Sequence, residues 1–310
     1  MNLFKKALIL PLTFFLCFFV ATFQSVNKVQ AVSIMNPLII MVGNSPEEIN
    51  HQTGLTKADI IYEMNVEFPF TRLMAVFLKN QSTNVGPVRS SRYYFSRIAA
   101  EWSPIFAHCG GQVLRNERLI NMDQMKYTYP YWRDKEIGGW INLFVETGKI
   151  REEAKKMGIS KKVELKNTFL NFGKISQKGG GFSKIAIKYN QNYLVSFQYD
   201  SNNNDYQRLI NEKIYKDAKT KKVLNISNII VQYVPVEKIP EDNEGRLKIN
   251  VIGEGIAKVF YGGHYVLAKW IKESKDHRTL FYRDNGELLQ LNEGQTWIEI
   301  VPEETEVYVK

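Results

Sequence analysis

Residues 58–77 read ADIIYEMNVEFPFTRLMAVF, and this stretch decides the fold of the N-terminal half. More polar and more apolar side chains alternate over residues 59–66, which predicts a β-strand with one face exposed to solvent. Residues 71–78 are almost wholly apolar, which predicts a second strand that is buried on both faces. Because the link at 67–70 is short, the two strands are expected to be neighbours.

The sequence after this pair of strands predicts a helix and a short strand. Residues 88–102 carry apolar side chains at helical spacing behind Pro87, so a helix is predicted to begin at residue 88. IFAH at 105–108 predicts a short buried strand that ends in a Gly-Gly turn. The other elements predicted in this half are a strand at 38–43 and helices at 113–120 and 147–158.

The residue pattern changes in the C-terminal half, where short β-type runs are separated by Gly and Asn turns and no long helical pattern occurs. This pattern predicts a mostly antiparallel sheet. The predicted strands lie at 184–189, 193–199, 228–234, 246–252, 256–261, 265–271, 279–283 and 296–301.

Residues 1–31 have the layout of a secretory signal peptide. A basic head, MNLFKK, precedes an apolar run of 17 residues, and Ala31 offers a small residue at a cleavage position. An uncleaved membrane anchor is the alternative, although the run is short for a spanning helix. The protein is therefore expected to be exported, either secreted or attached to the outer face of the cytoplasmic membrane, peripherally or through its N-terminus.

The charge balance is basic, with 41 Lys and Arg against 32 Asp and Glu, a net charge of +9. A basic surface suits anionic envelope polymers or lipid headgroups, and export argues against a nucleic-acid partner. Cleavage after Ala31 would remove Cys17 and leave only Cys109, so no intramolecular disulfide is expected.

The stretch GPVRSSRYYF (86–95) places Arg89 and Arg92 three residues apart at the start of the predicted helix. Unpaired backbone N–H groups and guanidinium groups together favour carboxylate or phosphate binding. Two interpretations stay open: a network with the protein's own acids, or a cleft that binds an anionic ligand. The candidate ligand-binding residues are Asp59, Glu63, Glu67, Arg72, Arg89, Arg92, His108, Gly110 and Gly111.

The adjacent residues His108 and Cys109 form a poor catalytic pair, because neighbours on a strand point to opposite faces. The four histidines show no metal-ligand spacing, so neither a metal nor a cofactor is expected. No residue is assigned a catalytic role. The alternative is an envelope hydrolase or transferase that uses His108 with Glu63 or Glu67.

Several uncommon strings occur in the order found in one family: ADIIYEMNVEFPFTRLMAVF, GPVRSSRYYF, HCGG, and in the C-terminal half NIIVQYVPVEKIPEDNEGRLKINVIGEG and WIKESKDHRTLFYRDNGELLQLNEGQTWIEIVP. The sequence resembles the YerB-like family of exported bacterial proteins, often described as lipoproteins, with two domains of unknown function. The resemblance spans residues 37–302. It departs from the family in lacking a convincing lipidation motif around Cys17 and in having Ile141 where many relatives have His.

The resemblance implies an α+β fold with layered sheets and helices, and no established activity. We expect a layered N-terminal domain of mixed sheet and helices at 36–175 and a mainly antiparallel β domain at 184–303, after the signal peptide at 1–31. The expected function is non-catalytic binding of an anionic cell-wall polymer or an envelope protein through an Arg-rich cleft.

Overall fold

The structure is a computed structural model that describes residues 32–35, 37–67, 69–102, 105–111, 120–121, 129–159, 162–165 and 181–310. The predicted signal peptide and residues 113–119 of the helix predicted at 113–120 lie outside the described residues, and Ile120 lies in a short strand. Residues 31–310 belong to one compact unit.

The predicted pair of strands is confirmed as an antiparallel hairpin of β3 (Ile60–Asn65) and β4 (Thr71–Phe77). Every residue of β4 is buried, as predicted, but every residue of β3 is buried too. The prediction that one face of β3 is exposed to solvent was wrong, because other segments cover both sides of the hairpin. β2 (Leu38–Gly43) pairs antiparallel with β4, and β5 (Ile105–Ala107) pairs parallel with β2 and with β6 (Ile120–Asn121).

The helix predicted at 88–102 is shorter than expected, since α2 spans Tyr93–Trp102. Residues 88–91 are extended instead, and Val88 forms an antiparallel bridge to Val42 of β2. Arg89 therefore lies outside the helix, and Arg92 immediately precedes it. The apolar stripe was predicted correctly, because Phe95, Ile98 and Trp102 are all buried.

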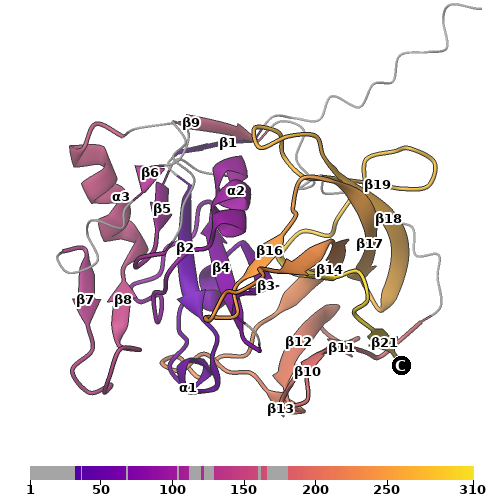
Figure 1. The fold of residues 1–310 in the computed structure, drawn as a ribbon, viewed down its shortest axis with the longest axis horizontal. Coiled ribbons are helices and arrows are strands. Elements are labelled where there is room, and N and C mark those ends of the chain that lie inside the picture. The colour runs from indigo at the N-terminus through magenta and orange to yellow at the C-terminus, as the bar shows by residue number, and fades with distance from the viewer. Residues whose placement is uncertain are drawn as a thin grey trace, which may run out of the picture. The chain divides into compact units, whose positions relative to one another are not determined.

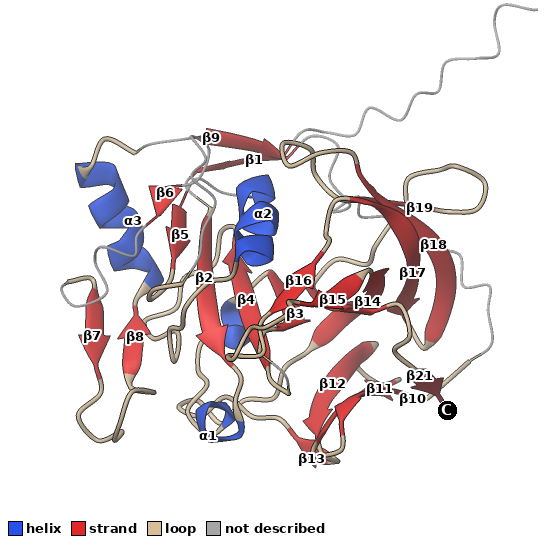
Figure 2. Cartoon of the chain, in the orientation of Figure 1, coloured by secondary structure: helices blue, strands red, loops and turns tan. Residues whose placement is uncertain are grey.

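The remaining described helices and two of the two-stranded sheets also lie in the N-terminal half (Figure 2), and the third two-stranded sheet, residues 236–238 with 247–249, lies in the C-terminal half. The helix predicted at 147–158 is confirmed as α3 (Thr147–Lys156). The other elements are α1 (Pro46–Ile49), η1 (Leu55–Lys57), the pair β1 (Val32–Met35) and β9 (Lys162–Leu165), and the pair β7 (Tyr131–Arg133) and β8 (Leu143–Val145).

Residues 181–310 contain no helix, and all eight predicted C-terminal strands occur. Their pairing is antiparallel except around the last long strand, β20. The strands are β10 (Lys184–Asn190), β11 (Tyr193–Asp200), β12 (Asp205–Ile210), β13 (Lys213–Ile214), β14 (Ile226–Val234), β15 (Val236–Lys238), β16 (Leu247–Ile249), β17 (Gly253–Tyr261), β18 (His264–Lys272), β19 (Leu280–Tyr282), β20 (Gln295–Pro302) and β21 (Val307–Val309).

β20 joins the two halves into one sheet, and Figure 1 labels the strands β14 and β3 that flank it. It lies between β14 and β3 and runs parallel to both, with Glu299 directly opposite Glu63. The strand order is β21-β10-β11-β12-β14-β20-β3-β4-β2-β5-β6, with β17 also paired to β14. The fold is α+β, as predicted, and one continuous sheet crosses both segments that were expected to form separate domains.

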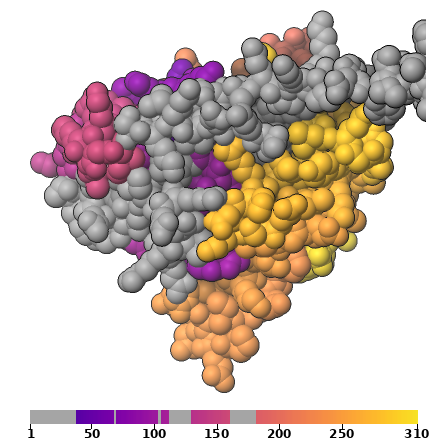
Figure 3. Space-filling model, turned by 90° about the horizontal axis from the view of Figure 1, so that it is seen from above, coloured from indigo at the N-terminus to yellow at the C-terminus, as the bar shows by residue number. Residues whose placement is uncertain are grey.

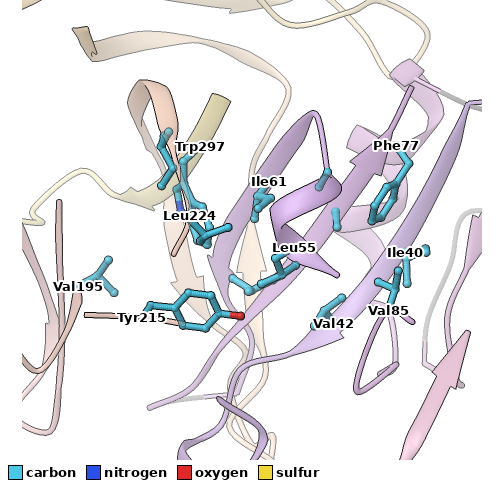
Figure 4. Close-up of a cluster of buried hydrophobic side chains, with 14 of the residues drawn as sticks. Ile40, Val42, Leu55, Ile61, Phe77, Val85, Val195, Tyr215, Leu224 and Trp297 are labelled. Carbon is cyan, nitrogen blue, oxygen red and sulfur yellow. The ribbon is translucent and has the colours of Figure 1, made fainter. Parts of the chain in front are cut away.

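The period-two alternation of each strand divides the core into two clusters on opposite faces of the sheet. One face carries Tyr62 and Met64 of β3 and the apolar side of α2. The other carries Ile61 and, from the C-terminal half, Trp297, whose side chains approach one another in Figure 4. Both cores therefore draw side chains from the two halves of the chain.

Candidate functional site

The GPVRSS and HCGG segments lie side by side, although 16 residues separate them. Cys109 N donates to Arg89 O at 2.9 Å, and Ser91 N donates to Gly110 O at 3.0 Å. Gly111 forms a parallel bridge to Ser91, and a Cβ atom at Gly111 would lie 2.1 Å from the Ser91 carbonyl oxygen. Its φ of +91° also favours glycine. Gly111 thus has a structural reason to be glycine.

The three candidate arginines are each paired with a carboxylate of the protein. Arg89 Nε lies 2.6 Å from Glu48 Oε1, and its guanidinium stacks 3.7 Å from the centre of the Trp140 ring. Glu67 pairs with Arg92 and, at 3.6 Å, with Arg72. Burial lowers the pKa of the Arg89 guanidinium, and the negative charge of Glu48 opposes that shift. The internal-network interpretation therefore accounts for these three side chains.

Glu48 is a partner that the sequence prediction missed. Ser45 and Glu48 form a capping box at the start of α1, with Ser45 N donating to Glu48 Oε2 at 2.8 Å. The Ser-x-x-Glu spacing at 45–48 is typical of a capping box, so the sequence could have predicted it. A Cβ at Gly43 would lie 2.2 Å from the Glu48 carboxyl group, so this glycine leaves room for the acid that binds Arg89.

His108 lies near these arginines in sequence but is 1% exposed. Its Nδ1 lies 2.9 Å from the carbonyl oxygen of Gly110, and its ring packs 4.9 Å from that of Phe106. The hydrogen bonds and ion pairs of Glu63 and Glu67 are made to other groups. The geometry therefore does not favour an acid–base pair of His108 with either glutamate.

Asp59 and Glu63 do not join the arginine network. Glu63 shares its face of β3 with Ile61, whereas Arg72 pairs with Met64 and faces the opposite side of the sheet. Asp59 precedes β3 at the other end and accepts a hydrogen bond from Leu78 N at 2.7 Å. The alternation of side chains along the hairpin thus separates acids and bases that are close in sequence.

Glu63 instead forms the centre of a buried polar cluster on the second face of the sheet. Its Oε2 accepts from Arg208 Nη2 at 2.9 Å, and both side chains are fully buried. Glu299 lies opposite Glu63 on β20 and accepts a hydrogen bond from Tyr189 Oη. Burial raises the pKa of Glu299 well above its ordinary value, and the charge of Glu63 raises it further. Glu299 is accordingly the protonated member of the pair.

We expect the variant Glu299→Gln to gain stability relative to the natural protein as the pH rises from about 5 to about 8. Folded Glu299 keeps a proton that the unfolded chain releases near pKa 4.5, so this residue makes stability fall with rising pH between its unfolded and folded pKa values. The slope is about 1.4 kcal/mol per pH unit within that window. Urea unfolding of both proteins across the pH range measures the difference, and a constant difference would contradict the assignment.

A cavity of about 700 Å³ opens between the start of α2 and the β15–β16 hairpin. Figure 3 shows that hairpin in orange, projecting beside purple residues of the N-terminal half. Four cations and two acids line the cavity, so its charge is positive. These residues are Arg92, Arg97, Arg246, Lys248, Glu237 and Asp242.

Arg97 is the lining cation whose charge is not matched by a carboxylate. Arg246 Nε pairs with Asp242 at 2.6 Å, and Lys248 pairs with Glu237 at 2.9 Å. Arg97 Nη2 donates to the hydroxyl of Tyr93 at 2.7 Å, and its Nε is buried without a hydrogen-bond partner among the described residues. The sequence prediction overlooked Arg97, because a single arginine on a helix carries no signal by itself.

Residues 26–160 match the N-terminal domain of a family described as protein of unknown function, DUF3048, and residues 185–298 match its C-terminal domain. The chain belongs to the DUF3048 family. The predicted YerB-like resemblance is thereby confirmed. The domain limits of 36–175 and 184–303 stay a prediction, because the DUF3048 segments share one sheet.

One relative shares most of this chain. The protein named "Putative lipoprotein YerB" from Bacillus subtilis strain 168 is 28% identical over 283 residues, which cover 88% of this chain and 83% of the relative. The crystal structure of the YerB protein from Bacillus subtilis aligns with a TM-score of 0.76 at 26% identity, covering 92% of this chain and 97% of that one. The fold is thus shared with YerB.

The described residues contain neither a candidate metal site nor a candidate membrane-spanning helix. Across the parts of the chain that the structure describes, no three His, Cys, Asp or Glu side chains are grouped so that they could hold a metal ion. Within the same parts, no helix combines the length and hydrophobicity needed to cross a bilayer.

Proposed function

We propose that this protein is an exported cell-envelope protein that binds an anionic ligand, without catalysis, in the cavity between α2 and the β15–β16 hairpin. The ligand class is a carboxylate- or phosphate-bearing cell-wall polymer, such as peptidoglycan or a teichoic-type chain. The observation that carries the proposal is Arg97, which lines the cavity and has no carboxylate partner in the described structure.

The other cations support this cavity as the continuation of the predicted Arg-rich cleft. Arg92 joins the predicted arginine pair to the cavity, and its side chain retains 16% of its exposure while it pairs with Glu67. Bidentate guanidinium contacts are the strongest hydrogen bonds that proteins make to carboxylates and phosphates. Three of the four lining cations are ion-paired, so the unmatched charge of Arg97 is what favours an anion over a neutral ligand.

Export is supported by the N-terminal sequence and by the family. The segment MNLFKK followed by a long apolar run is typical of a signal peptide. The relative from Bacillus subtilis bears the name "Putative lipoprotein YerB", and lipoproteins are exported proteins. Both observations favour a location outside the cytoplasm for this chain, where anionic wall polymers are present.

We expect Arg97→Gln to weaken binding to purified cell wall about tenfold, the loss that corresponds to one charged hydrogen-bonding group. Arg283→Gln is the matched control, since Arg283 lies outside this cavity and has no ion pair in the described structure. A pelleting assay with labelled protein measures both affinities. Equal binding by the two variants would contradict the proposal, and release of soluble wall fragments would favour the hydrolase alternative.

A further inference from the structure

A second cavity, of about 870 Å³, lies on the side of the sheet that carries the buried Glu63 cluster. Its walls come from both halves of the chain. α1 and the turn at 69–71 form one side, and residues 190–193 and 210–221 form the other. It shares no lining residue with the Arg97 cavity.

The floor of this cavity is polar, and three of its side chains are already engaged. Asn44, Thr71 and Tyr193 line the cavity, and each donates to Glu63 Oε1, at 3.0, 2.8 and 2.7 Å. Tyr215 also lines the cavity, and its hydroxyl is buried without a hydrogen-bond partner among the described residues. With one open hydroxyl, the floor has little capacity to bind a hydroxyl-rich ligand.

Two asparagines in the walls are also committed to the protein. Asn190 Nδ2 donates to Pro69 O at 2.9 Å, and Asn211 Nδ2 donates to Asn192 O at 2.9 Å. A neutral sugar needs many free donors and acceptors, because each buried hydroxyl must be satisfied. The walls therefore disfavour a neutral carbohydrate.

The remaining wall surface is apolar. Ile49, Ile210, Ile214 and Phe70 line the cavity. Phe70 is 42% exposed and Ile214 is 49% exposed, so both present apolar surface to the cavity. Burying these surfaces against a hydrocarbon chain would be favourable.

Three lysines border this apolar wall, and their charges are not matched. Lys213, Lys216 and Lys221 are exposed and form no ion pair in the described structure. The one acid that lines the cavity, Asp217, is 1% exposed, and its oxygens accept from Gly54 N at 2.7 Å and from four further donors. The border therefore presents positive charge to a ligand.

We propose that this cavity binds one molecule of an anionic amphiphile, with its apolar chain against Ile49, Ile210, Ile214 and Phe70 and its phosphate or carboxylate at Lys213, Lys216 and Lys221. The exposed apolar wall fits the chain of such a molecule, and the unmatched lysines fit its phosphate or carboxylate. This site is independent of the Arg97 cavity and does not rest on the function proposed there.

Calorimetric titration tests the proposal. The probes are octyl phosphate, decyl phosphate and octyl glucoside, each below its critical micelle concentration, and inorganic phosphate. We expect each added methylene to tighten binding about fourfold. The triple variant Lys213→Gln, Lys216→Gln, Lys221→Gln should weaken decyl phosphate binding about tenfold. The control triple Lys57→Gln, Lys135→Gln, Lys275→Gln removes three exposed lysines that line neither cavity and should leave binding unchanged.

Several results would overturn the proposal. Equal affinity for inorganic and octyl phosphate would show a simple anion site, and equal affinity for octyl glucoside would show an apolar pocket without charge recognition. Equal loss in both triple variants would place the amphiphile elsewhere. Pelleting with phosphatidylglycerol vesicles that decyl phosphate does not compete would assign the lysines to a membrane surface. Arg97→Gln should leave decyl phosphate binding unchanged, so failure here and failure of wall binding are distinguishable.

Discussion

The variant Glu63→Gln is expected to lose about 3–5 kcal/mol of folding free energy, the usual cost of removing one member of a buried ion pair. Arg208 and Glu63 are both fully buried, and Arg208 Nη2 lies 2.9 Å from Glu63 Oε2. Two further nitrogens of Arg208 have no hydrogen-bond partner among the described residues. Glu63 is thus the main compensation for a buried positive charge.

The amide that replaces the carboxylate adds a second penalty. Glu63 Oε1 accepts from Asn44, Thr71 and Tyr193. A glutamine has one carbonyl oxygen and one NH₂ group. Because both oxygens of Glu63 accept hydrogen bonds, the NH₂ group of the glutamine would face hydrogen-bond donors at one of the two positions. The substitution preserves shape and volume, which leaves charge and hydrogen bonding as the cause of any loss.

Chemical denaturation of the purified proteins measures this effect. Glu254→Gln is the control, because Glu254 pairs with Lys269 at 2.9 Å on an exposed surface. Exposed pairs contribute between about 0 and 1 kcal/mol, so the control should remain close to the natural protein. A loss below about 1 kcal/mol for Glu63→Gln would show that Arg208 does not depend on this carboxylate.

The second large effect is expected for Glu101→Gln, again a loss of about 3–5 kcal/mol. Glu101 lies on α2 and its Oε1 pairs with Lys272 Nζ of β18 at 2.7 Å, with side-chain exposures of 1% and 0%. Its carboxylate also accepts from the backbone N–H and the hydroxyl of Thr279, each at 3.0 Å. This cluster ties the helix of the N-terminal half to the sheet of the C-terminal half.

The double variant Glu101→Gln, Lys272→Met separates charge from packing. Removing both charges leaves no buried unpaired ion, so the double variant should recover most of the stability that the single variant loses. Unfolding curves of the two single variants and the double variant form a complete cycle. A double variant that loses the sum of the two single losses would show that the ion pair itself is not the source of the effect.

Local periodicity was sufficient to predict the elements that depend on near neighbours. The alternation at 59–66 gave β3 and its hairpin with β4, and the repeated β-runs gave the C-terminal strands. The Gly-Gly turn at 110–111 was correctly placed after a buried strand. In each case the signal lies within about ten residues, which is the range over which a single sequence is informative.

Contacts between distant segments could not be predicted in this way. Nothing in TWIEIV indicates that β20 pairs with β3 across more than 230 residues, and so the cover over Glu63 was missed. β12 was not predicted because DYQRLI mixes charged and apolar residues, and with it Arg208 was missed as the partner of Glu63. The helix start was placed too early, because pairing of Val88 with β2 overrides the helical pattern.

The position of β20 late in the sequence determines when the central sheet can be completed during folding. A ribosome delivers the N-terminus first, so β3 is made long before residues 295–302 that pair with it. Until then one side of β3 is an open, hydrophobic strand edge, the kind of surface on which nascent chains stick to one another. A product terminated between the two family segments would keep that edge permanently, so pairing of β20 with β3 requires synthesis of nearly the whole chain.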